Sequence, residues 1–502
     1  MRPVKPSVTR SLHFLIMKPC WIVLQEGLRM AEALLWTIEE LVAATGGRVE
    51  GAVTRELNGV AIDSRTIAAG DIFVAIKGDR TDGHDYVANA LMAGAGVAIV
   101  SRADQAMRDA GPLLIVDDAL AALENMGRAA RARSGARIIA VTGSVGKTTT
   151  KDALKVCLSA CGETHASVSS FNNHWGVPLT LARLPKTASY GVFEVGMNHA
   201  GEIEALIDMV RPHIAIVTAV AESHLGHFSS LTDIAHAKAE IFSGVVDGGT
   251  AIINQDSAFF DLLRKSAAGH GILDIRGFGE AETADIRLSK MTLHSNCSCV
   301  TANVCGNEVI CKIGAPGRHV VMNCLAVLGA CEAAGADLAR CALALANITP
   351  PSGRGVRHKL KVDGAKALLI DESYNANPAS MRAALEMLGS QNPEGRGRRI
   401  AVIGDMLELG TSSKQLHAEL LDPLNAARVD QVFACGPDMK TLWEQLPGDM
   451  QGAYADKSDN LVEALLGSIR QNDIIMVKGS LGSRMAVLVK AILENHGGSS
   501  EE

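Results

Sequence analysis

This chain of 502 residues has few aromatic residues, no surplus of basic residues and no long apolar run. Only 4% of the residues are Phe, Trp or Tyr, so stacking platforms for nucleic-acid bases are not expected. The formal net charge of −7 also argues against nucleic-acid binding, which depends on basic surfaces. No run approaches the roughly 18 apolar residues that a membrane-spanning helix needs. The composition therefore argues against nucleic-acid partners and against a membrane span.

The chain also lacks a recognisable cysteine pattern and an internal repeat. Its eleven cysteines are scattered, and the closest group, Cys297, Cys299, Cys305 and Cys311, fits no standard spacing of zinc ligands. Because Cys297 and Cys299 alternate in a strand-like run, we expect reduced, partly buried thiols. No unit of 20–50 residues repeats, which argues against a solenoid or a propeller.

The first 29 residues are expected to be an N-terminal extension rather than part of the fold. Basic residues precede a short apolar run, as in a signal peptide, but Lys18 and Pro19 break that run and no cleavage site of small residues follows. We favour the interpretation that the translation start is assigned too far upstream. Thr37 then predicts the beginning of a helix, with Glu40 as its capping-box partner.

The length predicts about three domains after the extension 1–29. Short strands and a helix fill residues 30–116, and residues 117–350 alternate strands and helices as a parallel sheet requires. Residues 351–502 repeat that alternation. The expected fold class is α/β, with a small α/β substrate domain, a central ATP-binding domain of the phosphate-loop type with a parallel sheet, and a Rossmann-like C-terminal domain. Within the central domain, residues 285–313 are predicted to form strand-rich hairpins.

The most informative segment runs from Ile139 to Thr150. An apolar, β-branched run enters a glycine-rich turn that ends in Lys-Thr-Thr and opens into a helix, the layout of a phosphate-binding loop. Lys147 adds a full charge, and Thr148 places a hydroxyl where a phosphate-bound Mg²⁺ would lie. Val141 stands where the general P-loop pattern has glycine, so a generic switch or motor is not favoured. The residues expected at the phosphates are Gly143, Ser144, Val145, Gly146, Lys147, Thr148 and Thr149.

Three side chains could complete a site beside this loop. Glu194 ends a predicted strand, where it is either a Mg²⁺ ligand or an ordinary capping carboxylate. His224 also follows an apolar strand and is either a metal ligand or a solvated loop histidine. Lys238 lies on a predicted amphipathic helix; if it is buried, its neutral amine could become a carbamate or act as a general base.

Several motifs together resemble the ATP-dependent Mur ligases of peptidoglycan synthesis over about residues 30–490. The segments Asp371–Pro378 and Gly404–Gly410 most resemble the branch that joins D-alanyl-D-alanine to UDP-N-acetylmuramoyl-tripeptide. The other motifs that carry the resemblance are Asp63–Thr66, Gly70–Ile76, Gly143–Thr149, Asn172-Asn173-x-x-Gly176-x-Pro178, Glu194–His199, Ala237-Lys238, Gly317-Arg-His319 with Asn323, and Ser352-Gly353-Arg354.

The resemblance implies a cytoplasmic, monomeric ligase that works through an acyl phosphate and the closure of its domains. It implies that Lys147, Lys238, His224 and Glu194 are catalytic, that Thr148 and Glu194 hold one Mg²⁺, and that His224 and carbamylated Lys238 hold a second. It assigns ATP binding also to Asn323, Arg354, Asp371, Tyr374 and Asn375. It assigns the UDP-sugar to Ser64 and Arg65, and the muramoyl-peptide to Asn172 and Asn173.

Other interpretations of the same residues stay open at this point. Asn323 could be a buried, satisfied amide, Arg354 a linker charge and Asp371 a strand-end cap. Asp405 and Glu408 could only cap their turn, and a contact with the peptide tail of the substrate is the one role suggested for Lys478. At the level of the whole chain, the alternatives are the ligase that adds the third residue of the peptide, folylpolyglutamate synthase, a regulatory or motor P-loop NTPase, and an inactive binding module. The third residue of the tripeptide, meso-diaminopimelate or lysine, is also left undecided.

Overall fold

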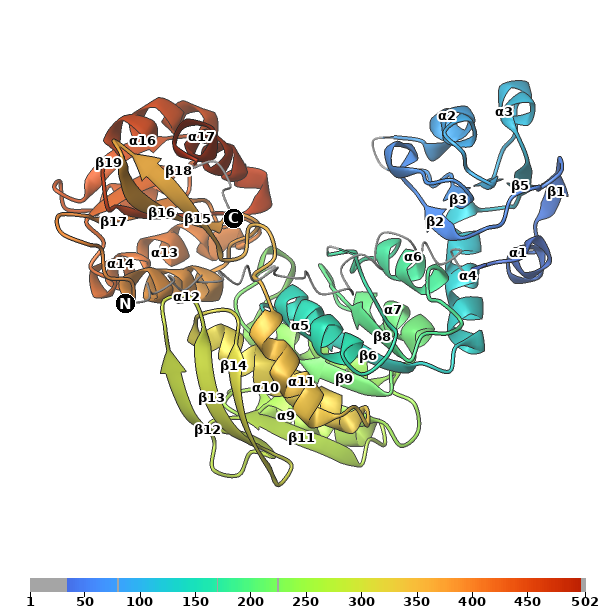
Figure 1. The fold of residues 1–502 in the computed structure, drawn as a ribbon, viewed down its shortest axis with the longest axis horizontal. Coiled ribbons are helices and arrows are strands. Elements are labelled where there is room, and N and C mark those ends of the chain that lie inside the picture. Colours follow the sequence, from blue (N-terminus) through green and yellow to red (C-terminus); the bar gives the residue numbers. More distant parts are fainter. Residues whose placement is uncertain (1–33, 79–80, 169, 224, 498–502) are drawn as a thin grey trace, which may run out of the picture. The chain divides into compact units, whose positions relative to one another are not determined.

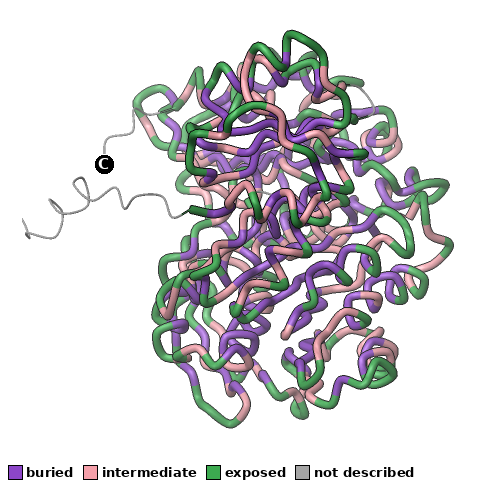
Figure 2. Tube along the Cα trace, turned by 90° about the vertical axis from the view of Figure 1, so that its right-hand side faces the viewer, coloured by how far each residue is buried: buried purple, intermediate pink, exposed green. Residues whose placement is uncertain are grey.

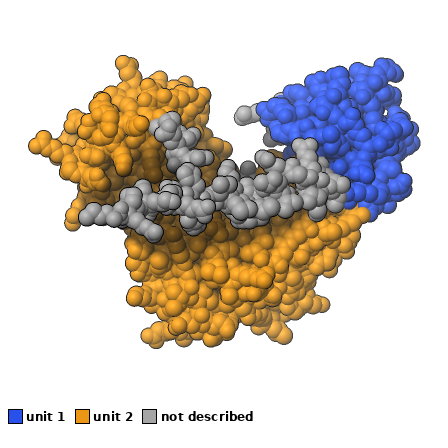
Figure 3. Space-filling model, in the orientation of Figure 1, with its two compact units in different colours: residues 1–43, 47–115 blue, residues 44–46, 116–502 orange. Residues whose placement is uncertain are grey.

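A computed structural model of the chain describes residues 34–78, 81–168, 170–223 and 225–497. The chain divides into two compact units, one made of Met1–Ala43 with Gly47–Ile115 and the other of Ala44–Gly46 with Val116–Glu502 (Figure 3). The predicted N-terminal extension, residues 1–29, lies outside the described residues. Among the described residues, none of the helices combines the length and the apolar character needed to cross a bilayer.

The first unit is built on a five-stranded sheet in the order β1-β5-β4-β3-β2. Strands β2 to β5 pair in parallel, and β1 pairs antiparallel with β5. The predicted capping box is confirmed, because Thr37 and Glu40 exchange two backbone-to-side-chain hydrogen bonds of 3.1 Å. The elements are α1 (Ile38–Thr45), β1 (Arg48–Glu50), β2 (Gly59–Ala61), η1 (Ser64–Thr66), β3 (Asp71–Val74), η2 (Gly83–Tyr86), α2 (Val87–Met92), β4 (Val97–Val100), α3 (Gln105–Ala110) and β5 (Leu113–Ile115).

The second unit begins with a nine-stranded sheet in the order β14-β13-β12-β11-β10-β9-β6-β8-β7 (Figure 1). Its strands are β6 (Arg137–Thr142), β7 (Thr164–Ala166), β8 (Tyr190–Glu194), β9 (Ile214–Val217), β10 (Thr250–Asn254), β11 (Asp274–Gly279), β12 (Ile286–Leu293), β13 (Ser298–Val304) and β14 (Asn307–Ile313). Its helices are α4 (Ala119–Arg133), α5 (Lys147–Ser159), α6 (Gly176–Ala182), α7 (Glu202–Val210), η3 (Leu225–His227), α8 (Leu231–Ala239), η4 (Glu240–Phe242), α9 (Phe260–Gly269), α10 (Arg318–Ala333), α11 (Leu338–Ala344) and η5 (Leu345–Asn347). The antiparallel pairing of β12, β13 and β14 confirms the predicted hairpins.

The central strand β6 is buried on both of its faces. Ile139 and Val141 pack into the core cluster that contains α5, α10 and α11, whereas Ile138 and Ala140 pack into the cluster on the other face. This alternation follows from the two-residue period of a strand. A strand covered on both faces needs an almost continuous apolar run, which is what β6 has. Figure 2 shows the resulting buried interior, with exposed residues gathered at the turns.

The C-terminal part of the second unit has a six-stranded sheet in the order β15-β16-β20-β17-β18-β19. Only β15 is antiparallel to its neighbour, so the predicted Rossmann-like arrangement of parallel strands is confirmed. The strands are β15 (Val356–Val362), β16 (Ala365–Glu372), β17 (Arg399–Gly404), β18 (Gln431–Cys435), β19 (Gln451–Ala455) and β20 (Ile474–Lys478). The helices are α12 (Pro378–Gly389), η6 (Gly410–Ser412), α13 (Ser413–Ala418), α14 (Leu421–Ala426), α15 (Lys440–Trp443), η7 (Ser458–Leu461), α16 (Val462–Ser468), η8 (Leu481–Ser483) and α17 (Ala486–His496).

Candidate active site

The glycine-rich turn lies between the end of β6 and the start of α5, as the sequence predicts. Gly143 has φ 149° and Gly146 has φ 84°, both in the region that favours glycine. A Cβ on Gly143 would lie 1.9 Å from Oγ1 of Thr218, and a Cβ on Gly146 would lie 2.7 Å from Oδ1 of Asn323. Both positions therefore require glycine, and Asn323 on α10 is placed directly against the turn.

Lys147 and Thr148 open α5 with their side chains directed at neighbouring polar groups. Nζ of Lys147 donates to the carbonyl of Gly143 at 2.6 Å. Burial lowers the pKa of this lysine, and Glu194 opposes that shift. The hydroxyl of Thr148 donates to Oε2 of Glu194 at 2.9 Å, and Nδ2 of Asn172 donates to the other carboxylate oxygen at 2.8 Å. The structure thus brings the predicted phosphate, metal and substrate residues into contact.

Lys238 is buried on α8, with 2% of its surface exposed. Burial, and secondly the charge of Lys147, lower its pKa well below the ordinary lysine value. This is the environment that the carbamate hypothesis requires, since only a neutral amine reacts with carbon dioxide. His224, the other residue predicted for the second metal, lies outside the described residues.

A cavity of about 430 Å³ opens beside the glycine-rich turn. Of the residues predicted to bind ATP, those that line it are Ser144, Val145, Gly146, Thr149, Asn323, Arg354 and Asn375. Arg354 stacks over the ring of Tyr374 at 4.2 Å and donates to Oγ of Ser170 at 3.3 Å. This contact connects the C-terminal part of the unit to the segment that precedes Asn172.

Asp371 and Tyr374 do not line this cavity. The carboxylate of Asp371 is buried and accepts two hydrogen bonds from Ser373, at 3.0 Å from its N–H and 2.6 Å from its hydroxyl. Asp371 therefore caps the turn that follows β16, and Tyr374 reaches the site through Arg354. Their part in nucleotide binding stays a prediction.

The cavity is also lined by residues that the sequence did not assign to the site, among them His319, Glu372 and Lys478. Nζ of Lys478 lies 3.4 Å from Oε2 of Glu372 and donates to the carbonyl of Asn375 at 2.9 Å. Burial lowers the pKa of Lys478, while Glu372 raises it. The signal in the sequence was the position of Glu372 and Lys478 at the carboxyl ends of the parallel strands β16 and β20, where open α/β sheets bind ligands.

The remaining predicted substrate residues lie in two places. Oδ1 of Asn173 accepts the N–H of Gly176 at 2.9 Å and so fixes the start of α6 next to Asn172. Ser64 and Arg65 belong to η1 of the first unit. Arg65 is exposed and forms an ion pair of 2.6 Å with Asp63, and its hydrogen bonds lower the pKa of Asp63 to about 2.

The segment Gly404–Gly410 contacts η3 of the central part. The N–H of Gly226 donates to the carbonyl of Glu408 at 2.9 Å. Glu408 has φ 64°, and a Cβ on Gly410 would lie 3.1 Å from Cα of Gly226. Arg382 and Glu222 add an ion pair of 3.4 Å beside this contact. The motif thus packs against η3 and is not only a turn of its own domain.

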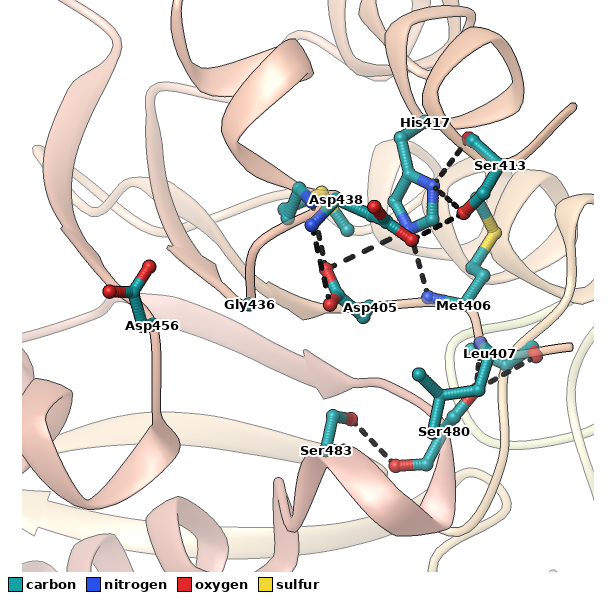
Figure 4. A network of polar contacts seen from close by, with 12 residues as sticks. Asp405, Met406, Leu407, Ser413, His417, Gly436, Asp438, Asp456, Ser480 and Ser483 are labelled. Atoms are coloured by element: carbon teal, nitrogen blue, oxygen red, sulfur yellow. Dashed lines mark hydrogen bonds and ion pairs between the residues drawn. The ribbon is translucent and has the colours of Figure 1, made fainter. Parts of the chain in front are cut away.

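A buried polar network holds the start of that motif (Figure 4). The carboxylate of Asp405 accepts the N–H of Met439 at 2.8 Å, which gives Asp405 a capping role. Nδ1 of His417 donates to the carbonyl of Ser413 at 2.7 Å, and its Nε2 accepts the N–H of Met406 at 2.9 Å. This pair of contacts fixes one neutral tautomer of His417 and thereby the path of the chain after β17.

Comparison with known proteins agrees with this geometry. Three family models match, namely the Mur ligase family catalytic domain over residues 56–141, the Mur ligase middle domain over 141–331 and the Mur ligase glutamate ligase domain over 357–481. The UDP-N-acetylmuramoyl-tripeptide–D-alanyl-D-alanine ligase of Escherichia coli (strain K12) is 35% identical over 91% of this chain and 98% of its own length. The chain belongs to the Mur ligase family. This membership excludes a regulatory or motor NTPase.

Solved structures place the chain in the MurF branch of the family. MurF from Acinetobacter baumannii superposes with a TM-score of 0.79 at 31% identity, over 91% of this chain and 99% of that one. MurF ligase from Thermotoga maritima, solved in complex with ADP, gives a TM-score of 0.71 at 25% identity, over 87% and 97% of the two chains. The three-domain α/β fold class predicted for this Mur ligase is confirmed.

Proposed function

We propose that this Mur ligase joins D-alanyl-D-alanine to UDP-N-acetylmuramoyl-tripeptide, with conversion of ATP to ADP and phosphate. The observation that carries the proposal is the contact of Thr148 with Glu194 at the start of α5, beside Lys147 and the cavity. Relatives that carry the name of this activity match the chain over nearly their whole length. The product is the UDP-linked pentapeptide precursor of peptidoglycan.

The reaction has two steps in which the protein positions groups and neutralises charge. A carboxylate oxygen of the tripeptide attacks the γ-phosphorus of ATP, and ADP leaves. The amine of D-alanyl-D-alanine then attacks the acyl carbon, and phosphate departs with the oxygen that the carboxylate supplied. Lys147 neutralises charge on the phosphates, and the cavity side chains of Asn323, Arg354 and Asn375 hold the nucleotide. Asp371 and Tyr374 contact the nucleotide as well in this proposal, and Tyr374 is supported in that role by its stacking with Arg354.

Magnesium suits the oxygen donors at the loop. The Thr148 hydroxyl and the Glu194 carboxylate lie 2.9 Å apart, and Mg²⁺ usually takes few protein oxygens, with phosphate oxygens and water completing its shell. Among the described residues there is no group of three or more His, Cys, Asp or Glu that could hold a metal. The proposal therefore gives one Mg²⁺ to Thr148 and Glu194. When bound, the metal offsets the negative charge that builds up on the phosphates.

A carbamate on Lys238 would supply the oxygen donors for a second Mg²⁺, together with His224. The supporting observation is the depressed pKa of the Lys238 amine, caused by burial and by Lys147. Addition of carbon dioxide to the neutral amine gives a carbamate anion and releases one proton. The buried neutral amine beside the positive charge of Lys147 thus becomes an anion of opposite charge to Lys147.

The other parts of the proposal concern substrates and organisation. Ser64 and Arg65 contact the UDP-sugar, and Asn172 and Asn173 contact the muramoyl-peptide. The functional domains are residues 30–116, 117–350 and 351–502. We expect a monomer that works in the cytoplasm, where its nucleotide-linked substrate would be made.

The test is a quantitative assay of ADP release with ATP, Mg²⁺ and both substrates, combined with mass spectrometry of the product. The proposal expects ADP release that requires UDP-N-acetylmuramoyl-tripeptide and D-alanyl-D-alanine together, with one pentapeptide formed per ADP. Dipeptides that end in L-alanine serve as the matched control and should not be joined. Rapid ATP turnover without either substrate would contradict the proposed ligase activity.

A further inference from the structure

Four cysteines from distant parts of the sequence converge where α5, α10 and α11 pack together (Figure 1). Cys157 lies on α5, Cys331 on α10 and Cys341 on α11, while Cys161 lies just after α5 ends. All four are free thiols. This group could not be predicted from the sequence, because its members are up to 184 positions apart.

Cys341 accepts a hydrogen bond from Cys331 and is also in contact with Cys161. Sγ of Cys161 lies 3.7 Å from Sγ of Cys341. A disulfide has a bond of about 2.05 Å, so the two sulfurs need to approach by less than about 2 Å, which is within reach of a change in side-chain torsion. Cys157 instead directs its S–H to the carbonyl of Cys341 at 3.4 Å. Of the thiols in contact with Cys341, Cys161 is partly exposed and Cys331 is buried, which favours the pair of Cys161 and Cys341 for oxidation from solvent.

The same pair combines an accessible thiol with a buried one. Cys161 is partly exposed, whereas Cys157, Cys331 and Cys341 are fully buried. A small oxidant can reach the first sulfur from solvent, and the second is already in contact with it. Neither residue lines the cavity beside the glycine-rich turn. The pair thus has no part in the ligase reaction proposed above.

We propose that Cys161 and Cys341 form an oxidation site at which a hydroperoxide produces a reversible disulfide. The Cys161 thiolate attacks one peroxide oxygen, the O–O bond breaks, and Cys161 becomes a sulfenic acid. The Cys341 thiolate then attacks that sulfur, the S–S bond forms, and hydroxide leaves and is protonated to water. In total, two thiols and one hydrogen peroxide give one disulfide and two waters, with two electrons passing from sulfur to oxygen.

Burial and hydrogen bonds set the pKa values of the two thiols and thereby the pH dependence of the rate of oxidation. Burial raises the pKa of the Cys161 thiol, so little thiolate is present at neutral pH and oxidation accelerates as the pH rises. The hydrogen bond from Cys331 lowers the pKa of Cys341, which favours its thiolate as the second nucleophile. The disulfide then connects the end of α5 to α11 across 180 positions of sequence. Closing so long a loop restricts the unfolded chain and raises the melting temperature.

The experiment treats the full-length protein with hydrogen peroxide at neutral and alkaline pH and follows intact mass, linked peptides and melting temperature. We expect loss of two hydrogen atoms per chain, a peptide that links Cys161 to Cys341, faster formation at alkaline pH, a raised melting temperature, and complete reversal by dithiothreitol.

Cys161→Ser and Cys341→Ser should abolish the link, and Cys341→Ala provides a second variant that adds no polar group to the core. Cys299→Ser removes an exposed thiol elsewhere and should leave the link intact. Addition of oxygen atoms to Cys161 without a link, or a link from Cys161 to any other cysteine, would overturn the proposal.

Discussion

The hydroxyl of Thr148 donates a hydrogen bond of 2.9 Å to Oε2 of Glu194, across the edge where β6 and β8 both end. The two strands are parallel neighbours, so their carboxyl ends place the helix start and the carboxylate side by side. A hydroxyl and a carboxylate oxygen at this spacing are a natural pair of ligands for a hard cation. The contact therefore connects the fold to the proposed metal chemistry.

Glu194→Gln tests the metal role of this pair. The amide keeps the shape of the side chain and can still accept from Thr148, but it lacks the negative charge. We expect the Mg²⁺ concentration for half-maximal ADP release to rise by about 10–100-fold. Glu282→Gln changes an exposed carboxylate far from the loop in sequence and is the control. An unchanged Mg²⁺ requirement in Glu194→Gln would remove this carboxylate from the metal site.

Lys147→Ala tests the phosphate-binding role of the turn. Its ammonium is the full positive charge nearest the glycine-rich backbone, where it donates to Gly143. Loss of one such charge from a preorganised site typically lowers kcat by about 10²–10³-fold. We expect the rate of steady-state ADP release to fall by this factor, while the melting temperature stays unchanged. Lys290→Ala, at an exposed position on β12, should keep wild-type rates, whereas wild-type rates in Lys147→Ala would refute the assignment.

Lys238→Ala tests the carbamate. The variant loses the amine that would carry it, and we expect activity to fall about 100-fold or more. Short carboxylic acids at high concentration should restore part of the activity, because they supply the missing oxygen donors. Lys265→Ala replaces an exposed lysine on α9 and is the control. This variant should keep wild-type activity without added carboxylic acid. Full activity of Lys238→Ala without added acid would exclude the carbamate.

The pH dependence of stability reports on the same amine independently of catalysis. Burial and Lys147 lower the pKa of Lys238 in the folded chain below the ordinary value of 10.5 that the unfolded chain retains. Between these two values the unfolded state binds more protons, so the free energy of unfolding rises with pH, by at most about 1.4 kcal/mol per pH unit. Urea unfolding in buffer free of carbon dioxide should show this rise in the wild type and a smaller one in Lys238→Met. Equal slopes would contradict the depressed pKa.

Local patterns predicted much of the fold. The run Ile138–Thr142 predicted β6, the glycines and Lys147 predicted the turn and α5, and Thr37 with Glu40 predicted the start of α1. These features depend on backbone conformation and on hydrogen bonds within a few residues, which neighbouring sequence determines.

Long-range packing could not be predicted in the same way. The contact of Asn323 with Gly146, the contact of Gly226 with Glu408 and the cysteine group all join segments that are distant in sequence. For Asp371, the motif alone was not enough to predict the contacts of the side chain. The motif indicated a nucleotide contact, but in the structure one carboxylate oxygen accepts two hydrogen bonds from the nearby Ser373. A motif identifies which residues matter, but neighbouring side chains determine what each one touches.

Transfer of a labelled oxygen tests the central claim most directly. If the carboxylate of the tripeptide attacks ATP at the site formed by Lys147, Thr148 and Glu194, and both of its oxygens are ¹⁸O, one of them must leave in the inorganic phosphate while the other stays in the new amide. The account predicts one ¹⁸O in each phosphate released during pentapeptide formation, measured by mass spectrometry in unlabelled water. Phosphate without ¹⁸O would contradict the account, because it would show that water, and not the peptide, receives the phosphoryl group.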